Sequence, residues 1–221
     1  EHIHTFALSV SLSVIATFFC FILGYPLAYI MSRSDRNGQK IPMMLLMLPM
    51  WTNLLIRTYS MMAIMDDGGI LNGILTQIGL NKVHLIGTKG AVIFGMAYDF
   101  FPYMVLPLYT AVSKIDKSLI EAAADLGCSH FKVLSRVILP LSSSGIISGV
   151  TMVFVPSIST FYISQKLGGG TFDLLGDTIE RQFQNVNTYN TGAAISLVMM
   201  ILVLLSLWFM NRFADSEGGK N

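Results

Sequence analysis

The chain has 221 residues, of which 53% are hydrophobic and only 12% are charged, and its formal net charge is +1. Soluble domains carry about 25% charged residues, so this composition excludes a soluble domain and predicts an integral membrane protein. The small net charge gives no general attraction to nucleic acid. The two cysteines, Cys20 and Cys128, lie in environments too different to indicate a disulfide framework or a metal site.

Five apolar segments are long enough to cross a bilayer core of about 30 Å, which takes about 20 helical residues. No strand-like alternation competes with them, so the sequence predicts an all-α helix bundle that forms one transmembrane domain over residues 1–221. The chain begins at Glu1 rather than at Met, and we expect a further part of the natural protein before it. The predicted spans are residues 6–31, 41–65, 91–112, 141–163 and 191–210.

Lys and Arg residues near the ends of the spans predict the orientation of the chain. Four of them fall in loops 66–90 and 164–190, which we expect to be external. Nine fall in loop 32–40, in loop 113–140 and in the tail, which we expect to be cytoplasmic. These nine are Arg33, Arg36, Lys40, Lys114, Lys117, Lys132, Arg136, Arg212 and Lys220.

Each external loop is predicted to contain a short amphipathic helix. Residues 69–80 place several isoleucines and leucines on one helical face. In the other loop, Leu174, Leu175, Ile179 and Phe183 form a second apolar face. The glycines at 168–170 allow a sharp reversal of the chain before that helix.

Two charged residues interrupt the predicted spans, Arg57 in the second and Asp99 in the third. A charge inside a membrane helix costs about 2.5–3.5 kcal/mol on insertion scales, so it needs a partner or a water-filled path. A rise of about 1.5 Å per residue puts both in the outer half of the membrane, at depths about 6–8 Å apart. They are therefore either a structural ion pair or part of a solute pathway, where Asp99 would suit a cationic solute. Trp51 and Tyr162 are further pathway candidates, with helix packing as the alternative.

No catalytic or metal-binding motif is found in the sequence. A G-x-x-x-x-G-K-[ST] loop is missing, so the chain is not expected to bind ATP through a P-loop, and there is no H-E-x-x-H or Cys/His cluster. We therefore expect no catalytic residue, no metal and no cofactor in this chain. A membrane enzyme is the least favoured alternative.

Residues 121–140, EAAADLGCSHFKVLSRVILP, lie in the cytoplasmic loop 113–140 and are too polar for the membrane. Ser118 and Glu121 match a capping box, which predicts a helix start at Ser118, and Gly127 is placed to stop that helix in the left-handed conformation. Such a short helix is unstable in water unless it docks against something. A second helix is predicted over 129–139, ending at Pro140. The loop either joins two spans or acts as a lever for a soluble partner.

The loop resembles the EAA loop of binding-protein-dependent ABC importer permeases. Residues 121–123 match E-A-A, Gly127 follows after three further residues, and Leu139-Pro140 matches the end of the pattern. Residues 49–59 and 101–109 are also similar to spermidine/putrescine permease subunits of that family. The resemblance implies that this loop couples the spans to an ATPase. The coupling residues it implies are Glu121, Ala122, Ala123, Asp125, Gly127, Leu139 and Pro140.

The resemblance further implies a type I permease fold of usually six spans, so we expect a sixth span before Glu1. The implied partners are two ATPase subunits that bind ATP and Mg²⁺, a second permease subunit (identical or different) and an external solute-binding protein, in the cytoplasmic membrane of a bacterium. The implied cargo is a polyamine. An importer of another small solute, such as an amino acid, an iron chelate or thiosulfate, stays open, as does a stand-alone channel or secondary transporter.

Overall fold

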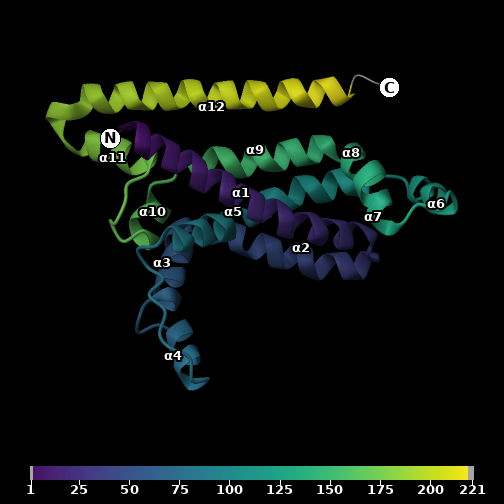
Figure 1. Ribbon diagram of the computed structural model, residues 1–221, viewed down its shortest axis with the longest axis horizontal. Helices are drawn as coiled ribbons and strands as arrows, with labels where there is room; N and C mark the ends of the chain where they lie inside the picture. Colours follow the sequence, from purple (N-terminus) through teal and green to yellow (C-terminus); the bar gives the residue numbers. More distant parts are fainter. Residues whose placement is uncertain (1, 219–221) are drawn as a thin grey trace.

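The computed structural model describes residues 2–218, and within that range the chain is helical, with no strand (Figure 1). This confirms the all-α fold. The centre of the bundle is made by α1 (His2–Arg33), α5 (Lys89–Ser113) and α9 (Ser143–Ser159), which pack side by side. The last helix, α12 (Tyr189–Gly218), runs along α9 at the edge of the bundle.

Helices α5 and α9 approach closely because two glycines four positions apart face α5. A Cβ added at Gly145 would lie 2.4 Å from Ala111 Cβ, and one at Gly149 would lie 2.8 Å from Met104 Sδ. Small residues at this spacing let membrane helices bring their backbones together, which increases van der Waals contact. The pair therefore forms the rigid centre on which the functional segments are mounted.

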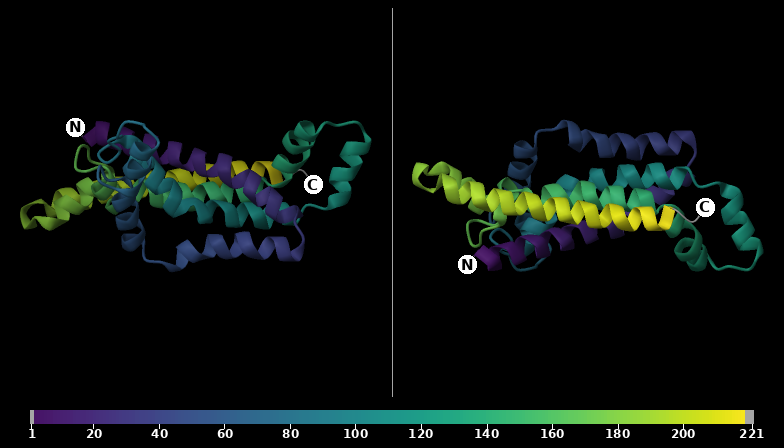
Figure 2. Two further views of the ribbon diagram at one scale, coloured as in Figure 1. Left: turned by 90° about the horizontal axis from the view of Figure 1, so that it is seen from below. Right: turned by 90° about the horizontal axis from the view of Figure 1, so that it is seen from above.

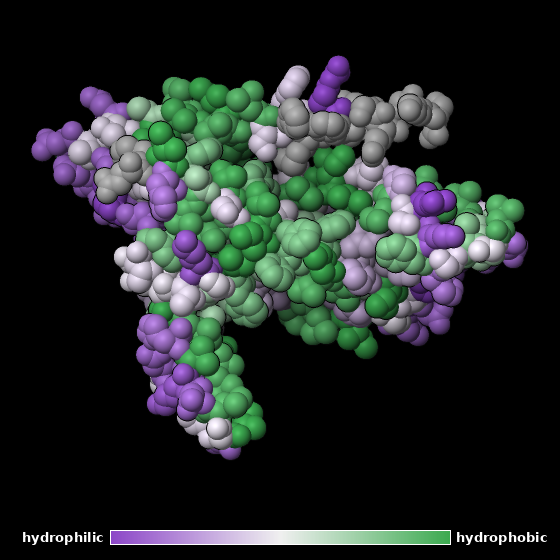
Figure 3. Space-filling view, in the orientation of Figure 1, coloured by the Kyte–Doolittle hydropathy of each residue, from purple (hydrophilic) through white to green (hydrophobic). Residues whose placement is uncertain are grey.

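Three helices of the described residues are long and apolar enough to cross a membrane, and the number rises to five if two bent pairs are each counted as one span. The exposed surface of the bundle is strongly apolar, as Figure 3 shows, which fits contact with lipid. Helix α2 (Arg36–Trp51) lies to one side of the bundle (Figure 2). An apolar cavity of about 710 Å³ separates it from α1 and α5.

The second predicted span, 41–65, is wrong as a continuous helix. It consists of α2 and α3 (Leu54–Met65), which are bent by 100° across Thr52 and Asn53. Pro49 removes a backbone donor near the end of α2. The side chain of Asn53 then caps α3 by accepting a hydrogen bond from the Leu55 N–H at 2.8 Å. The proline and this cap together favour the break.

The fourth predicted span, 141–163, is also interrupted. Helix α9 ends at Ser159, Thr160 is extended, and the short helix α10 (Tyr162–Leu167) follows. At its other end α9 is bent by 72° from the helical segment 130–141 that precedes it. Pro156 deprives the last turn of α9 of a hydrogen bond, which explains why the helix stops early.

The loops group at opposite ends of the molecule, as the charge distribution predicts. The junction of α1 with α2, the segment 114–141 and the end of α12 lie at one end (Figure 1). The start of α1, α10 and α11 (Leu175–Gln184) lie at the other. Lys220, one of the nine expected cytoplasmic cations, is outside the described residues.

The external helix predicted within 69–80 is α4 (Ile70–Gln77), which projects from the bundle beyond α3 (Figure 1). Its exposed apolar face includes Ile70, Ile74 and Ile78, and Figure 3 shows this apolar strip beside a polar one. The buried side chain of Asn72 ties α4 to the chain that follows it. It donates a hydrogen bond to the Val83 carbonyl at 3.0 Å and accepts one from the Val83 N–H at 2.8 Å.

Candidate functional site

The first helix of the cytoplasmic loop is α6 (Lys117–Asp125), and its N-cap is Asp116. The predicted capping box of Ser118 and Glu121 is therefore wrong. Asp116 Oδ1 accepts the hydrogen bond of the Ser118 N–H at 3.0 Å, so the helix begins before the residue that was expected to cap it. The same hydrogen bond lowers the pKa of Asp116, because it stabilises the carboxylate form.

The helix stops at Gly127, which has a φ of +78°. The Gly127 N–H donates to the Ala124 carbonyl at 2.9 Å, and the Cys128 N–H donates to the Ala123 carbonyl at 3.2 Å. This pair of hydrogen bonds is a Schellman motif, in which the left-handed residue closes the last helical turn. The glycine therefore defines the length of α6 and the direction in which the chain leaves it.

No residue of α6 is buried, so the helix offers its surface to a partner. Leu126 is 85% exposed and Phe131 is 76% exposed, although both are large and apolar. We call Leu119, Glu121, Ala122, Leu126 and Phe131 the coupling surface. The family resemblance named Glu121 and Ala122 as coupling residues, which stays a prediction, and it did not name the three large apolar residues. Bulky apolar residues in an otherwise polar loop are the signal that points to them.

The second part of the loop forms one helical segment with an irregular centre. It consists of α7 (His130–Val133), the π-helix η1 (Leu134–Ile138) and α8 (Leu139–Leu141). The predicted helix over 129–139 exists, but it continues through Pro140 and bends only at Ser142. Buried Val133 and Ile138 anchor the segment to the bundle. Leu139 is half-buried and Pro140 is exposed, so they connect the loop to α9.

A hydrogen bond joins this segment to the first helix. Tyr25 Oη lies 2.8 Å from Ser142 Oγ, and the hydroxyl of Ser142 donates to the Leu139 carbonyl at 3.2 Å. Because Ser142 donates to Leu139, Tyr25 is the donor in the first contact. No sequence signal pointed to this pair, which is 117 residues apart along the chain.

A second cavity, of about 890 Å³, lies between α5, α9 and the cytoplasmic loop. We call it the inner cavity. Thr110, Ser144 and Ser148 place hydroxyl groups along it, and Lys114 and Asp116 add charged groups. Most of its lining is apolar, but these groups give it more polar surface than the cavity beside α2 has, so it is the better suited of the two to a hydrated solute.

The structure brings Arg57 and Asp99 together. Arg57 Nε lies 3.3 Å from Asp99 Oδ1, with the two side chains 9% and 0% exposed. Thr58 Oγ1 donates to Asp99 Oδ2 at 3.4 Å. Among the described residues, Arg57 Nη1 has no hydrogen-bond partner. The burial of Asp99 favours the structural role over direct contact with solute, and both roles stay predictions.

The other two pathway candidates lie beside the breaks in the bent spans. Trp51 is the last residue of α2 and is 88% exposed. Tyr162 is the first residue of α10 and contacts Tyr59 of α3, with ring centroids 6.1 Å apart and an interplanar angle of 73°. The ammonium group of Lys166 lies 5.1 Å from the Tyr59 ring centroid and 5.8 Å from that of Tyr162. Tyr59 and Lys166 were not among the pathway residues predicted from the sequence.

A buried carboxylate holds the external end together. Asp177 in α11 accepts hydrogen bonds from the Ser164 hydroxyl at 2.7 Å and from the Leu174 N–H at 2.8 Å. The Leu175 N–H donates to Ser9 Oγ of α1 at 2.8 Å. Burial raises the pKa of Asp177 to about 6. This carboxylate therefore titrates closer to neutral pH than an exposed one.

A bundle of apolar helices of membrane-spanning length, with an exposed helical loop attached to two of them, defines an integral membrane protein. The chain belongs to the family described as the binding-protein-dependent transport system inner membrane component, whose family model matches residues 6–216.

Among curated relatives, the chain is 37% identical over 214 residues to the spermidine/putrescine transport system permease protein PotB of Escherichia coli strain K12, covering 95% of this chain and 78% of that one. It is 39% identical over 206 residues to the protein of the same name from Haemophilus influenzae, covering 92% and 72%. Among solved structures, a bacterial ABC transporter involved in the import of the acidic polysaccharide alginate matches with a TM-score of 0.80 at 18% identity, covering 97% of this chain and 79% of that one. At this identity the structural match shows the fold alone.

Proposed function

We propose that this chain is the permease subunit of an ATP-driven importer that carries polyamines, such as spermidine and putrescine, across the inner membrane. The observation that supports this cargo is the 37% identity, over 95% of the chain, with a permease named for it. The partners are two ATPase subunits, a second permease subunit and an external solute-binding protein. The chain itself performs no covalent chemistry, and ATP with Mg²⁺ binds to the ATPase subunits.

In this proposal the coupling surface docks on an ATPase subunit, and movement of the ATPase is passed to the spans along two routes. One route runs from the start of α6 through buried Ile115 to α5. The other runs through the Gly127 stop and the segment 130–141 to the bend at Ser142 and on to α9. Because α5 and α9 pack tightly through Gly145 and Gly149, they move as one body. The inner cavity between them and the loop then opens or closes to the cytoplasm.

The exposed apolar residues Leu119, Leu126 and Phe131 support a docking role for the loop. A surface helix that only joins two spans has no need for them, whereas burial in a cleft of a soluble partner would remove their apolar area from water, with a gain of about 25 cal/mol per Å². The surfaces available to a solute-binding protein are the external loops, which include the projecting helix α4 and the short helix α11.

The test is uptake of labelled spermidine by vesicles that contain this chain assembled with its partner subunits. We expect uptake that requires ATP, and we expect Glu121→Lys to abolish uptake while ATP hydrolysis continues. Glu121→Gln, which keeps the shape of the side chain, serves as the milder control. An intact assembly that imports another solute but no polyamine would refute the proposed cargo. Flux through this chain reconstituted alone would refute the importer.

A further inference from the structure

Two tyrosines from different helices lie together beside a primary ammonium group. Tyr59 of α3 and Tyr162 of α10 meet edge to face, and Lys166 Nζ lies 5.1 Å from one ring centroid and 5.8 Å from the other. Both distances fall within the range of about 6 Å at which a cation is attracted to the negative face of an aromatic ring. The two rings are therefore arranged as a site for an ammonium ion.

No carboxylate lies within ion-pairing distance of Lys166 in the part of the chain that the structure describes. The contacts that hold its ammonium group are those with the two tyrosines. The Lys166 side chain is half-exposed, and its ammonium group lies beside the two rings rather than on an acid. A free ammonium ion of the same size could occupy the same aromatic site.

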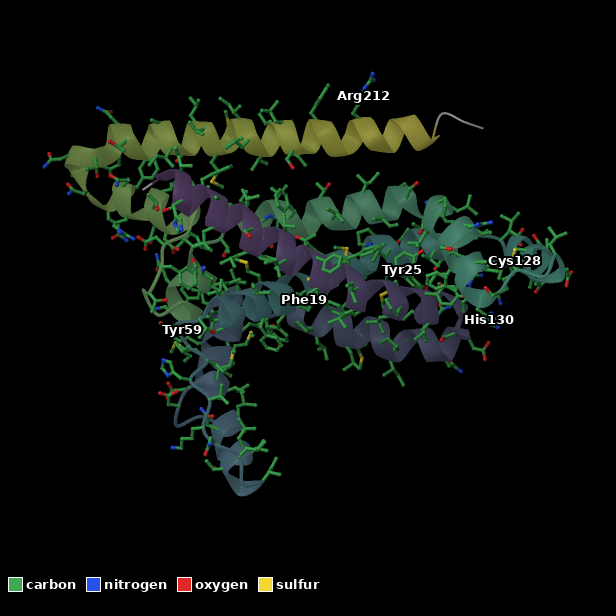
Figure 4. All side chains as sticks on the ribbon, viewed as in Figure 1. Phe19, Tyr25, Tyr59, Cys128, His130 and Arg212 are labelled. Atoms are coloured by element: carbon green, nitrogen blue, oxygen red, sulfur yellow. The ribbon has the colours of Figure 1, made fainter. Side chains whose placement is uncertain are left out.

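The position of this site fits a path through the membrane protein. Tyr59 follows the break between α2 and α3, and Tyr162 follows the break between α9 and α10. Broken helices are tolerated within a membrane where their backbone is buried in protein or lines a water-filled space. Tyr59 is 47% exposed, so a solute can reach its ring. Figure 4 shows Tyr59 at the end of the molecule opposite Cys128 and His130 of the cytoplasmic loop.

We propose that Tyr59 and Tyr162 form a binding site for a primary alkylammonium group, and that Lys166 is a tethered ammonium which occupies this site when no solute is present. The inference rests on the proposed function, because putrescine and spermidine end in primary ammonium groups. An arriving solute replaces Lys166 with a group of the same charge and chemistry, so the exchange leaves the charge beside the rings unchanged. A neutral or anionic solute gains nothing from the rings and does not displace Lys166.

The proposal makes Lys166 a competitor of the solute, and this can be measured by binding. Labelled spermidine is titrated into the permease and ATPase assembly in lipid nanodiscs, with the solute-binding protein omitted because it would set the apparent affinity. Lys166→Met should tighten spermidine binding roughly two- to thirtyfold, the range that a cation–π contact supports. Lys166→Arg, which keeps a cation over the rings, should bind as the wild type does. Tyr59→Leu should weaken binding.

A double variant separates competition at the rings from a general effect of removing a positive charge. In the Tyr59→Leu background the site is lost, so adding Lys166→Met should change the affinity little. If Lys166→Met tightens binding equally in both backgrounds, the effect is general electrostatics and the proposal is wrong. An unchanged or weaker affinity of Lys166→Met alone would also overturn it.

A second measurement needs no variant. The complete wild-type complex is treated with an amine-acetylating reagent with and without spermidine, and labelling is measured by mass spectrometry. We expect spermidine to increase labelling of Lys166, released from the rings, and to leave exposed Lys89 unchanged. Protection of Lys166, or no change, contradicts the proposal. If the wild type imports no polyamine in the uptake assay, the proposed function itself fails, and that result is obtained before any variant is made.

Discussion

Tyr25 of α1 donates a hydrogen bond of 2.8 Å to Ser142, the residue at which the chain bends by 72° from the cytoplasmic loop into α9. The contact is buried. It ties the first helix of the bundle to one of the two points at which the cytoplasmic loop joins the spans. A change in the bend therefore either carries α1 along or breaks this hydrogen bond.

We expect Tyr25→Phe to loosen that connection. The variant keeps the ring but loses the donor, and Ser142 keeps its hydrogen bond to Leu139, so the cost in folding stability should be about 1 kcal/mol. The larger effect should be a lower ratio of spermidine imported to ATP hydrolysed. Tyr29→Phe, on the same helix, is the matched control. Equal ratios for the two variants would show that the Tyr25 hydroxyl has no part in coupling.

Gly127 should tolerate asparagine better than a β-branched residue. Nothing lies within 4 Å of a Cβ added there, so a substitution is opposed only by the φ of +78°. An L-residue in this conformation costs about 1–2 kcal/mol, and asparagine adopts it more readily than others. Gly127→Val should therefore uncouple uptake from ATP hydrolysis, whereas Gly127→Asn should retain most uptake. Equal loss in both variants would mean that the absence of a side chain, rather than backbone conformation, matters at this position.

The Arg57–Asp99 pair is tested by removing one or both charges. Arg57→Met leaves a buried carboxylate without its counter-charge, which should cost about 3–5 kcal/mol and reduce assembly. The double variant Arg57→Met with Asp99→Leu should recover assembly, measured as the yield of intact complex. Uptake by the recovered complex then indicates a structural pair. Assembly without uptake indicates a pathway role, and in that case Asp99→Asn should weaken the apparent affinity for a polyamine.

Asp177 should make the stability of the external end depend on pH. Its ordinary pKa of 3.8 is raised to about 6, chiefly by burial and partly by Asp173, while the Leu174 N–H, the Ser164 hydroxyl and Arg181 oppose the rise. A raised pKa means that the folded state holds the proton more tightly than the unfolded state. The contribution of Asp177 to stability therefore falls as the pH rises from about 4 to about 6 and stays constant above that.

The measurement is the unfolding temperature of the wild type minus that of Asp177→Asn, which does not titrate. This difference should decrease as the pH is raised from 4 to 7. Asp173→Asn, which removes an exposed neighbour but leaves the buried carboxylate, should keep most of the pH dependence. A difference that is flat with pH would show that the pKa of Asp177 is the same in the folded and unfolded states.

The parts of the molecule that could be predicted are those that depend on local residue chemistry. A sufficiently long apolar run in a membrane protein forms a helix. A glycine that follows an alanine-rich helix ends it by adopting the left-handed conformation. Two opposite charges in adjacent spans have few possible partners other than each other. Arg57, Asp99 and Gly127 belong to this group. Their structural setting follows from their own type and spacing.

The parts that could not be predicted depend on a choice between two suitable residues or on contacts between residues far apart in the sequence. Asp116 and Ser118 are both good N-cap residues two positions apart, and the choice between them is made by how the chain leaves α5. The break at Thr52 and Asn53 needs the packing of α3 against α10 as well as the nearby proline. The partner of Tyr25 is far away along the chain, so no window of sequence contains it.

The five residues of η1, Leu134–Ile138, form a π-helix inside the segment that joins the coupling surface to α9. A π turn holds one residue more than an α turn, and each α-helical residue corresponds to about 100° of rotation. The extra residue therefore changes the rotation about the helix axis between the two ends of this segment. That rotation sets the direction in which α6 faces relative to α9. We expect a deletion of one residue here to restore an ordinary helix and to turn α6 away from the direction that the proposed docking requires, while every residue of the coupling surface is kept.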